Sequence, residues 1–188
     1  MRKKKYFAVP LFIAINIVIF LLSCAGIGTV HQLGVYAAAV INHGQWYRVL
    51  TAQFSHFNIS HLLFNMAALY SIGHTIERAI GSWKLLALYL SAGALGNGLS
   101  LCVFLSSHQD VLLAGASGAI FALLGHLTYV YIMRDKYRLY AFGGGFVRGI
   151  VFTFLLSSLS GGSFVGHLCG FVFGFIISGI MFPFRVLG

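Results

Sequence analysis

Charged residues are scarce in this sequence. Asp, Glu, Lys and Arg make up 8% of the 188 residues, whereas a soluble domain carries about 25%. Apolar residues make up 59%, and the mean hydropathy is +0.91. This composition excludes an ordinary soluble domain and predicts that lipid is the solvent for most of the protein surface. The length allows a single domain, over residues 1–188.

Acidic residues are the rarest charged type, with only Glu77, Asp110 and Asp135 in the chain. A pair of aspartates within membrane spans is lacking, which excludes an aspartyl intramembrane protease. An HExxH motif is also lacking, so a zinc metalloprotease would have no ligand set. No apolar run contains lysine, and a Ser–Lys catalytic pair is therefore excluded as well.

Cysteine is also infrequent. Cys24, Cys102 and Cys169 all lie in apolar segments, and none has the spacing of a metal site. A set of disulfides would use an even number of cysteines, and this chain has three, so we interpret them as small core residues. The chemistry considered below needs no metal or other cofactor, and we expect none.

Apolar runs account for most of the chain. A membrane-spanning helix needs about 20 mostly apolar residues. Six spans are predicted, at residues 7–26, 59–76, 85–105, 112–133, 146–159 and 164–184. The connections are short, except for residues 27–58. The predicted fold class is an all-α membrane protein with six transmembrane helices.

Lys and Arg lie almost entirely on one side of these spans. With the N-terminus in the cytoplasm, eleven of the twelve face inward and only Arg48 faces outward. Cytoplasmic loops carry such an excess, so both termini are predicted to be cytoplasmic. The net charge of +9 then indicates a bilayer with anionic lipids, not nucleic acid, as the partner. A cleaved signal peptide is the alternative for the first span, but its apolar run is long for one.

A few polar residues lie within the predicted spans, where they indicate function. The second, fourth and sixth spans run from outside to inside. His61, Ser117 and His167 lie near the starts of these spans, about 3–8 Å below the outer boundary at 1.5 Å per residue. Asn65 lies one turn below His61 on the same face. His61, Ser117 and His167, which have chemically reactive side chains, are therefore predicted to lie at a similar depth in the membrane.

Small residues recur every four positions beside two of these side chains. The rows are Gly166, Gly170, Gly174 and Ser178 in the sixth span, and Ala114, Gly118 and Ala122 in the fourth. Such rows mark tightly packed helix interfaces in membranes. Packing the two rows together would bring Ser117 and His167 within hydrogen-bond reach.

A serine next to a histidine is the minimal unit of nucleophilic acyl transfer. The hydroxyl becomes a good nucleophile when a base removes its proton, and histidine suits that task near neutral pH. Asp110 is the only acid on the outer side, so a Ser–His dyad without a carboxylate is favoured over a triad. The backbone N–H of Ser117 and the side chains of His61 and Asn65 are candidate donors to the oxyanion.

These residues fall within motifs that resemble the rhomboid family. Gly115-Ala116-Ser117-Gly118, followed by Gly166-His167 and Gly170, is similar to the GxSG motif and the sixth-span histidine of the family's catalytic dyad. Three further similarities are His56 with His61 and Asn65 in the second span, Trp46 and Arg48 in the first loop, and Gly73 and Glu77 where the second span ends. The resemblance covers about residues 5–184.

The resemblance implies an intramembrane serine endopeptidase that cleaves transmembrane substrates near the outer face. Residues 27–58 would form a membrane-embedded loop, and the fifth span would be the gate that admits the substrate. Phe121 stands where many relatives carry a Tyr that stacks on the catalytic histidine, and a Phe can also stack there. Tyr47 inserts one residue into the family's W-R pair.

Each candidate also has a purely structural interpretation. Ser117 and His167 can be packing residues bonded to backbone carbonyls, and His61 and Asn65 can hold helices together. We assign supporting roles to Gly115, Gly118, Phe121, Gly166 and Gly170, structural roles to Trp46, Arg48, His56 and Glu77, and no role to His31, His43, His74, His108 and His126.

Two other functional classes remain as alternatives. One is a catalytically inactive rhomboid-like protein that binds and escorts membrane helices, although the presence of both Ser117 and His167 favours the protease. The other is a transporter, which would need an inverted repeat that the sequence does not show. The expected partners are transmembrane substrates and the bilayer, and the expected location is a bacterial inner membrane. The sequence leaves the natural substrate and the oligomeric state open.

Overall fold

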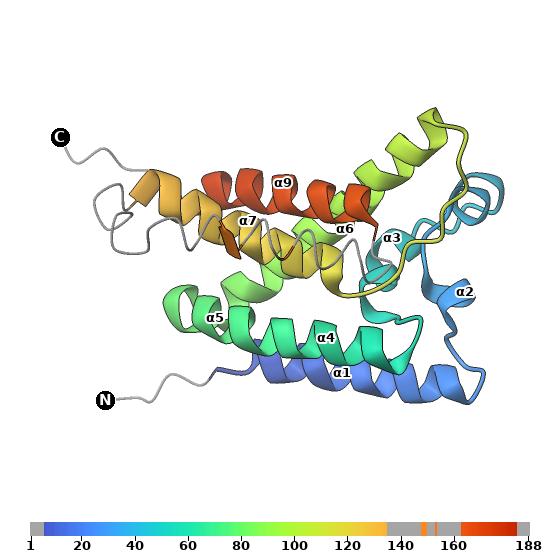
Figure 1. Ribbon diagram of the computed structural model, residues 1–188, viewed down its shortest axis with the longest axis horizontal. Coiled ribbons are helices and arrows are strands. Elements are labelled where there is room, and N and C mark those ends of the chain that lie inside the picture. Colours follow the sequence, from blue (N-terminus) through green and yellow to red (C-terminus); the bar gives the residue numbers. More distant parts are fainter. Residues whose placement is uncertain (1–5, 135–147, 150–152, 154–162, 184–188) are drawn as a thin grey trace.

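The computed structural model describes residues 6–134, 148, 149, 153 and 163–183, and most of them are helical (Figure 1). No strand occurs among them, and their β-structure is one antiparallel bridge between Val35 and Leu113. The predicted all-helical class is therefore confirmed for these residues. Most of the predicted fifth span, 146–159, lies outside the described residues.

The main helices follow the predicted apolar runs. They are α1 (Ala8–Cys24), α4 (Ile59–Ala68), α5 (His74–Ile80), α6 (Ser82–Ser106), α7 (Ser117–Arg134) and α9 (Phe164–Met181). A π-helical segment, Leu69–Gly73, joins α4 to α5, so the second predicted span extends unbroken to Ile80. Of the described helices, α6 and α9 are long and apolar enough to cross a membrane, and α1 and α7 are apolar but shorter.

The predicted start of the fourth span at residue 112 is wrong. Leu113 exchanges two backbone hydrogen bonds with Val35, of 3.0 and 2.9 Å. Gly115 has a φ angle of +116°, which is outside the helical region and favours glycine. The helix α7 therefore begins at Ser117, which is its first residue.

The long connection between the first two predicted spans contains short helices. They are α2 (Val30–Leu33), a π-helical turn (Ala38–Asn42), α3 (Arg48–Thr51) and a 3₁₀ turn (Ala52–Phe54). The buried Arg48 donates through Nη1 to the carbonyls of His31 and Gly34, at 2.7 and 2.9 Å. A guanidinium can satisfy several acceptors at once, so Arg48 holds the start of this connection against α3. Trp46, by contrast, is exposed.

Glu77 joins three helices at one end of the bundle. Its buried carboxylate accepts hydrogen bonds from the backbone amide of Ala8 at 2.6 Å and from the hydroxyl of Ser82 at 2.6 Å. A carboxylate is favourable at a helix N-terminus because unpaired N–H groups point toward it. Glu77 therefore caps α1 and fixes it to the turn between α5 and α6.

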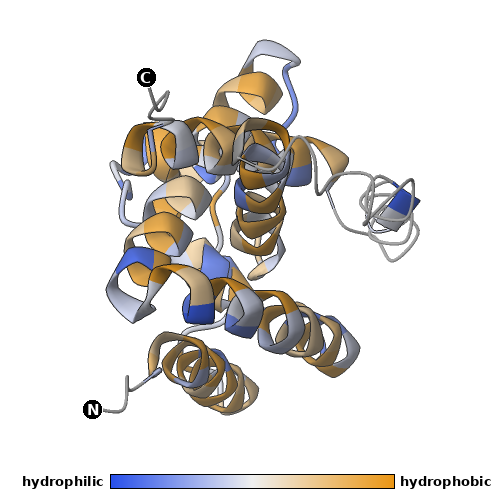
Figure 2. Ribbon diagram, turned by 90° about the vertical axis from the view of Figure 1, so that its left-hand side faces the viewer, coloured by the Kyte–Doolittle hydropathy of each residue, from blue (hydrophilic) through white to orange (hydrophobic). Residues whose placement is uncertain are grey.

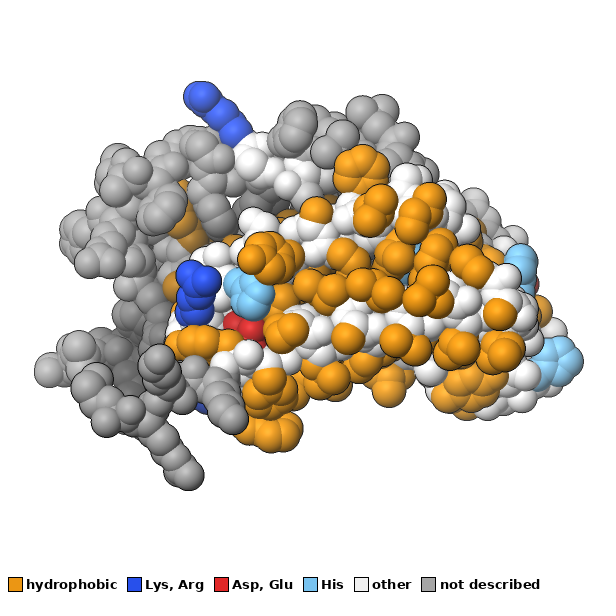
Figure 3. Space-filling model, turned by 90° about the horizontal axis from the view of Figure 1, so that it is seen from below, with side chains coloured by type: hydrophobic (Ala, Val, Ile, Leu, Met, Phe, Trp, Pro, Cys, Tyr) orange, Lys and Arg blue, Asp and Glu red, His pale blue; other side chains and the backbone are white. Residues whose placement is uncertain are grey.

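The helices form a bundle in which α7 and α9 lie side by side and α1 runs along α4 and α5 (Figure 1). In the core, the ring of Phe12 stacks on Tyr89 with 4.1 Å between ring centroids. Apolar residues also cover outward faces of the helices (Figure 2). Figure 3 shows one largely hydrophobic face, with Lys or Arg, acidic and His side chains toward one end and further His side chains at the opposite end. Such a large exposed apolar surface suits contact with lipid.

Candidate active site

The turn before α7 holds Ser117 in place. The amide of Gly115 donates to the carbonyl of Ala52 at 2.9 Å, and the amide of Ala116 donates to Nε2 of His56 at 3.4 Å. Both contacts tie the turn to the connection between α1 and α4. Ser117 is half-buried, so its hydroxyl is positioned at the first residue of a helix without being sealed off.

His167 lies in the first turn of α9. Ser163 caps this helix, and its hydroxyl oxygen accepts a hydrogen bond from the amide of Gly166 at 3.1 Å. Nε2 of the buried His167 lies 2.8 Å from Oγ of Ser117. The ring of Phe121 stacks on the imidazole, with 4.4 Å between centroids and 16° between planes. The structure thus brings together Ser117, His167 and Phe121 from two helices.

Two glycines of α9 allow its close contact with α7. A Cβ atom on Gly170 would overlap the carbonyl oxygen of Gly118, and one on Gly174 would overlap that of Ala122. A Cβ on Gly166 would make only ordinary contacts, the nearest at 3.4 Å. Gly170 and Gly174 therefore set how closely the helices approach, while Gly118 provides the backbone surface that Gly170 meets.

His61 lies against the turn that precedes Ser117. A Cβ atom on Gly115 would be 2.6 Å from Cε1 and 2.9 Å from Nε2 of His61, so the imidazole fills the space beside this glycine. Asn58 caps α4 and accepts a hydrogen bond from the amide of His61 at 2.8 Å. The side-chain amide of Asn65 donates to the carbonyl of His61 at 2.8 Å. One hydrogen of Asn65 is thus bound within its own helix.

His56 lies behind His61, outside the helical segments. Burial, together with the nearby His61 ring, lowers the pKa of His56 from 6.5 to about 3, although a backbone hydrogen bond at Phe54 acts in the opposite direction. The two imidazole centroids are 5.1 Å apart. A neutral His56 agrees with its role as acceptor for Ala116, because a charged imidazole has no free lone pair.

Two polar side chains to which the sequence assigned no role, Asn97 and His126, join helices in the structure. Asn97 on α6 donates to the carbonyl of Val49 at 3.0 Å and so joins α6 to α3. His126 on α7 lies 2.9 Å from the hydroxyl of Ser178 on α9. Their only signal in the sequence is a polar residue inside an apolar run, which does not identify a partner.

The acidic residues do not build a metal centre in the described part of the chain. No group of three or more His, Cys, Asp or Glu there has an arrangement that could hold a metal ion. The carboxylate of Asp110 accepts a hydrogen bond from the amide of Ala37 at 2.7 Å. Chemically, the site offers a hydroxyl beside an imidazole and a helix N-terminus.

The fold and this site define a helical protein with a serine and a histidine paired at the starts of two apolar helices. A family described as Rhomboid domain matches residues 43–184. The chain therefore belongs to the rhomboid family, whose members are integral membrane proteins.

Individual relatives carry names that agree with this assignment. The chain is 36% identical over 169 residues to Rhomboid protease GluP of Bacillus subtilis (strain 168), which covers 85% of this chain and 32% of that protein. It is 36% identical over 146 residues to Rhomboid-like protease 1 of Toxoplasma gondii, and the match covers 73% of this chain and 48% of that protein. It is 29% identical over 159 residues to RHOMBOID-like protein 5 of Arabidopsis thaliana, and the match covers 80% of this chain and 50% of that protein. The matched region spans a third to a half of these relatives.

Proposed function

We propose that this protein is an intramembrane serine endopeptidase in which Ser117 is the nucleophile and His167 the general base. The observation that carries the proposal is the 2.8 Å contact between Oγ of Ser117 and Nε2 of His167 at the start of a helix. The names of the relatives, which include proteases, support the same reaction class.

In the proposed reaction, Oγ of Ser117 attacks the carbonyl carbon of the scissile bond and its proton passes to Nε2 of His167. The imidazolium then protonates the leaving amine, and water hydrolyses the acyl-enzyme with His167 again as the base. Stacking on Phe121 holds the imidazole plane in the orientation that both steps need. The proposed mechanism assigns no role to a carboxylate.

The oxyanion is proposed to lie between the N-terminus of α7 and His61. The backbone amide of Ser117 points outward from the first turn of a helix, where the helix dipole also favours negative charge. The imidazole of His61 faces Gly115 beside this amide. Asn65 is proposed as a further donor through the hydrogen that is not bound to the carbonyl of His61.

The membrane arrangement is part of the proposal. Residues 1–188 form one domain of six spans with both termini in the cytoplasm, in a bacterial inner membrane, and the substrate is a transmembrane helix cut near the outer face. The parallel directions of α4, α7 and α9, which all begin toward the right of Figure 1, support a common outer level for His61, Ser117 and His167.

The test is cleavage of a reporter transmembrane segment by the purified protein in liposomes. The variants are Ser117→Ala and His167→Asn, with Ser91→Ala as the matched control, because the hydroxyl of Ser91 bonds only locally to the carbonyl of Ala87 at 2.6 Å. We expect cleavage by the wild type and by Ser91→Ala, and none above background by the other two.

Cleavage that survives in Ser117→Ala would refute the nucleophile. If the wild type binds several segments and cleaves none of them, the protein is instead a helix-binding member of the family that lacks activity.

A further inference from the structure

A second serine–histidine contact joins the same two helices farther along their length. His126 on α7 and Ser178 on α9 are both buried, and Nδ1 of the imidazole lies 2.9 Å from the serine hydroxyl. The residue types are exchanged between the helices relative to the first pair, in which α7 carries the serine. This second pair has no place in the proposed reaction.

The hydrogen bonds of Ser178 exclude it as a nucleophile. Its hydroxyl donates to the carbonyl of Gly174 at 2.6 Å, and a hydroxyl has one hydrogen to donate. Nδ1 of His126 must therefore carry the hydrogen of their contact and donate it to Oγ of Ser178. An activated serine needs the opposite direction, with the imidazole as acceptor. The contact is a directional bond from α7 to α9.

Between the two pairs, the interface consists of backbone against backbone. Gly170 meets Gly118, Gly174 meets Ala122, and a Cβ atom on Gly125 would overlap the carbonyl oxygen of Phe171. Small residues allow this close approach, but they offer few side-chain atoms that interlock along the helix axis. Directional side-chain bonds are then needed to fix how far one helix is displaced along the other.

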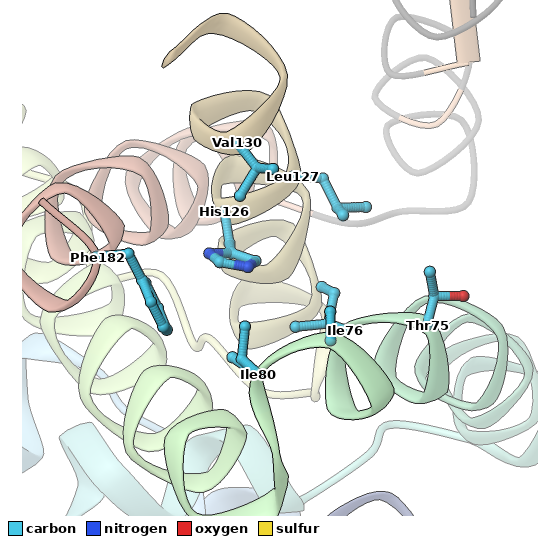
Figure 4. A pocket seen from close by; sticks show the side chains of 8 residues that line it. Thr75, Ile76, Ile80, His126, Leu127, Val130 and Phe182 are labelled. Carbon is cyan, nitrogen blue, oxygen red and sulfur yellow. The ribbon is translucent and has the colours of Figure 1, made fainter. Parts of the chain in front are cut away.

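On its other side, His126 borders a cavity. The cavity has a volume of about 160 Å³ and lies between α7 and α5 at this level, and its lining includes Thr75, Ile76, Ile80, Leu127, Val130 and Phe182 (Figure 4). The ring of Phe182, just after α9, lies 5.3 Å from the imidazole. The position of α7 at this level therefore depends on its contacts with α9 more than on packing against α5.

We propose that His126 and Ser178 are positioning residues, which fix the axial register of α7 against α9 and thereby the contact between Ser117 and His167. The inference rests on the proposed function. A displacement of about 1 Å at a reacting centre can reduce a rate about 10²-fold, whereas interhelical hydrogen bonds in membranes contribute little to stability on average. Loss of this bond should slow the reaction of Ser117 more than it destabilises the fold.

The experiment measures how fast Ser117 reacts with a fluorophosphonate probe, which needs no substrate-binding step. In this reaction the Oγ–P bond forms, the P–F bond breaks, fluoride leaves, and the hydroxyl proton passes to His167. Rates are compared for the wild type, Ser178→Ala, His126→Leu and His126→Asn. The control is Thr128→Val on the same helix, because the hydroxyl of Thr128 bonds within α7 to the carbonyl of Leu124 at 2.9 Å.

Ser178→Ala and His126→Leu should slow labelling about tenfold when each protein is measured equally far below its own unfolding temperature. His126→Asn retains an N–H near the position of Nδ1, so it should label within about twofold of the wild type, as should Thr128→Val. The inference would be overturned if Ser178→Ala labelled at the wild-type rate. It would also be overturned if the slowing disappeared when the proteins are compared equally far below their own unfolding temperatures. Absence of labelling in the wild type would instead overturn the proposed function.

Discussion

Replacement of Gly170 by Ala tests the interface that brings the two helices together. The added Cβ would overlap the carbonyl oxygen of Gly118 and would lie 2.9 Å from its carbonyl carbon and 3.2 Å from its Cα. These atoms are backbone, so a rotamer change cannot relieve the overlap. Because ordinary heavy-atom contacts are about 3.5–4.0 Å, the helices must separate by about 1 Å.

Two effects of Gly170→Ala follow from that separation. Overpacking of this kind costs about 1–3 kcal/mol of stability. It also moves His167, on the preceding helical turn, away from Ser117, and a 1 Å error in a catalytic contact can cost about 10²-fold in rate. We expect a lower unfolding temperature in detergent and cleavage of a reporter segment reduced about 100-fold.

Gly179→Ala is the matched control, because it makes the same change on the same helix. Its added Cβ would lie 3.5 Å from Cε2 of Tyr129, which is an ordinary contact. Alanine is also the better helix former, by about 0.5–1 kcal/mol, so stability should be unchanged or slightly higher. Equal activity and stability in the two variants would refute the argument that Gly170 sets the distance between the helices.

Three further predictions concern other contacts. Glu77→Gln should destabilise the protein by about 1–3 kcal/mol in equilibrium unfolding, because it removes the charge of the carboxylate that accepts the hydrogen bond from the Ala8 amide; unchanged stability would show that this carboxylate does not stabilise the start of α1. The pKa of His56 is lowered to about 3, mainly by burial, so below pH 6.5 the unfolded state binds more protons than the folded state, and His56 should contribute a loss of stability as the pH falls, of about 2 kcal/mol at pH 5; a His56→Gln variant should lose less stability than the wild type between pH 7 and pH 5, and an equal loss in both would assign the dependence to other groups. Phe121→Ala should lower kcat about tenfold, since it frees the imidazole plane of His167, and an unchanged kcat would show that the stacking is dispensable.

Some of this arrangement is readable from the sequence because it depends on local periodicity. The four-residue rows of small residues predicted that α7 packs against α9, and Gly170 does meet Gly118. Hydropathy located the helices to within a few residues for most spans. It failed at the start of α7, because the bridge between Val35 and Leu113 and the φ angle of Gly115 depend on tertiary contacts.

The contacts that the sequence did not predict join residues far apart in the chain. Glu77 accepts the amide of Ala8, 69 positions away, and no periodic pattern links the two. His126 has the same sequence signature as any isolated polar residue in a span, so its bond to Ser178 became visible only once the helices were packed. The short helices between residues 27 and 58 are likewise held by side chains such as Arg48, which donates to the carbonyls of His31 and Gly34, and such backbone acceptors leave no signature in the sequence.

His167 is proposed to activate Ser117. Peptide mapping of the fluorophosphonate-treated protein tests this activation, because it locates the modified side chain. We expect an adduct on Ser117 in the wild type, and almost none in His167→Asn under the same conditions. An adduct on a different serine, or equally rapid modification of Ser117 without His167, would contradict this proposal.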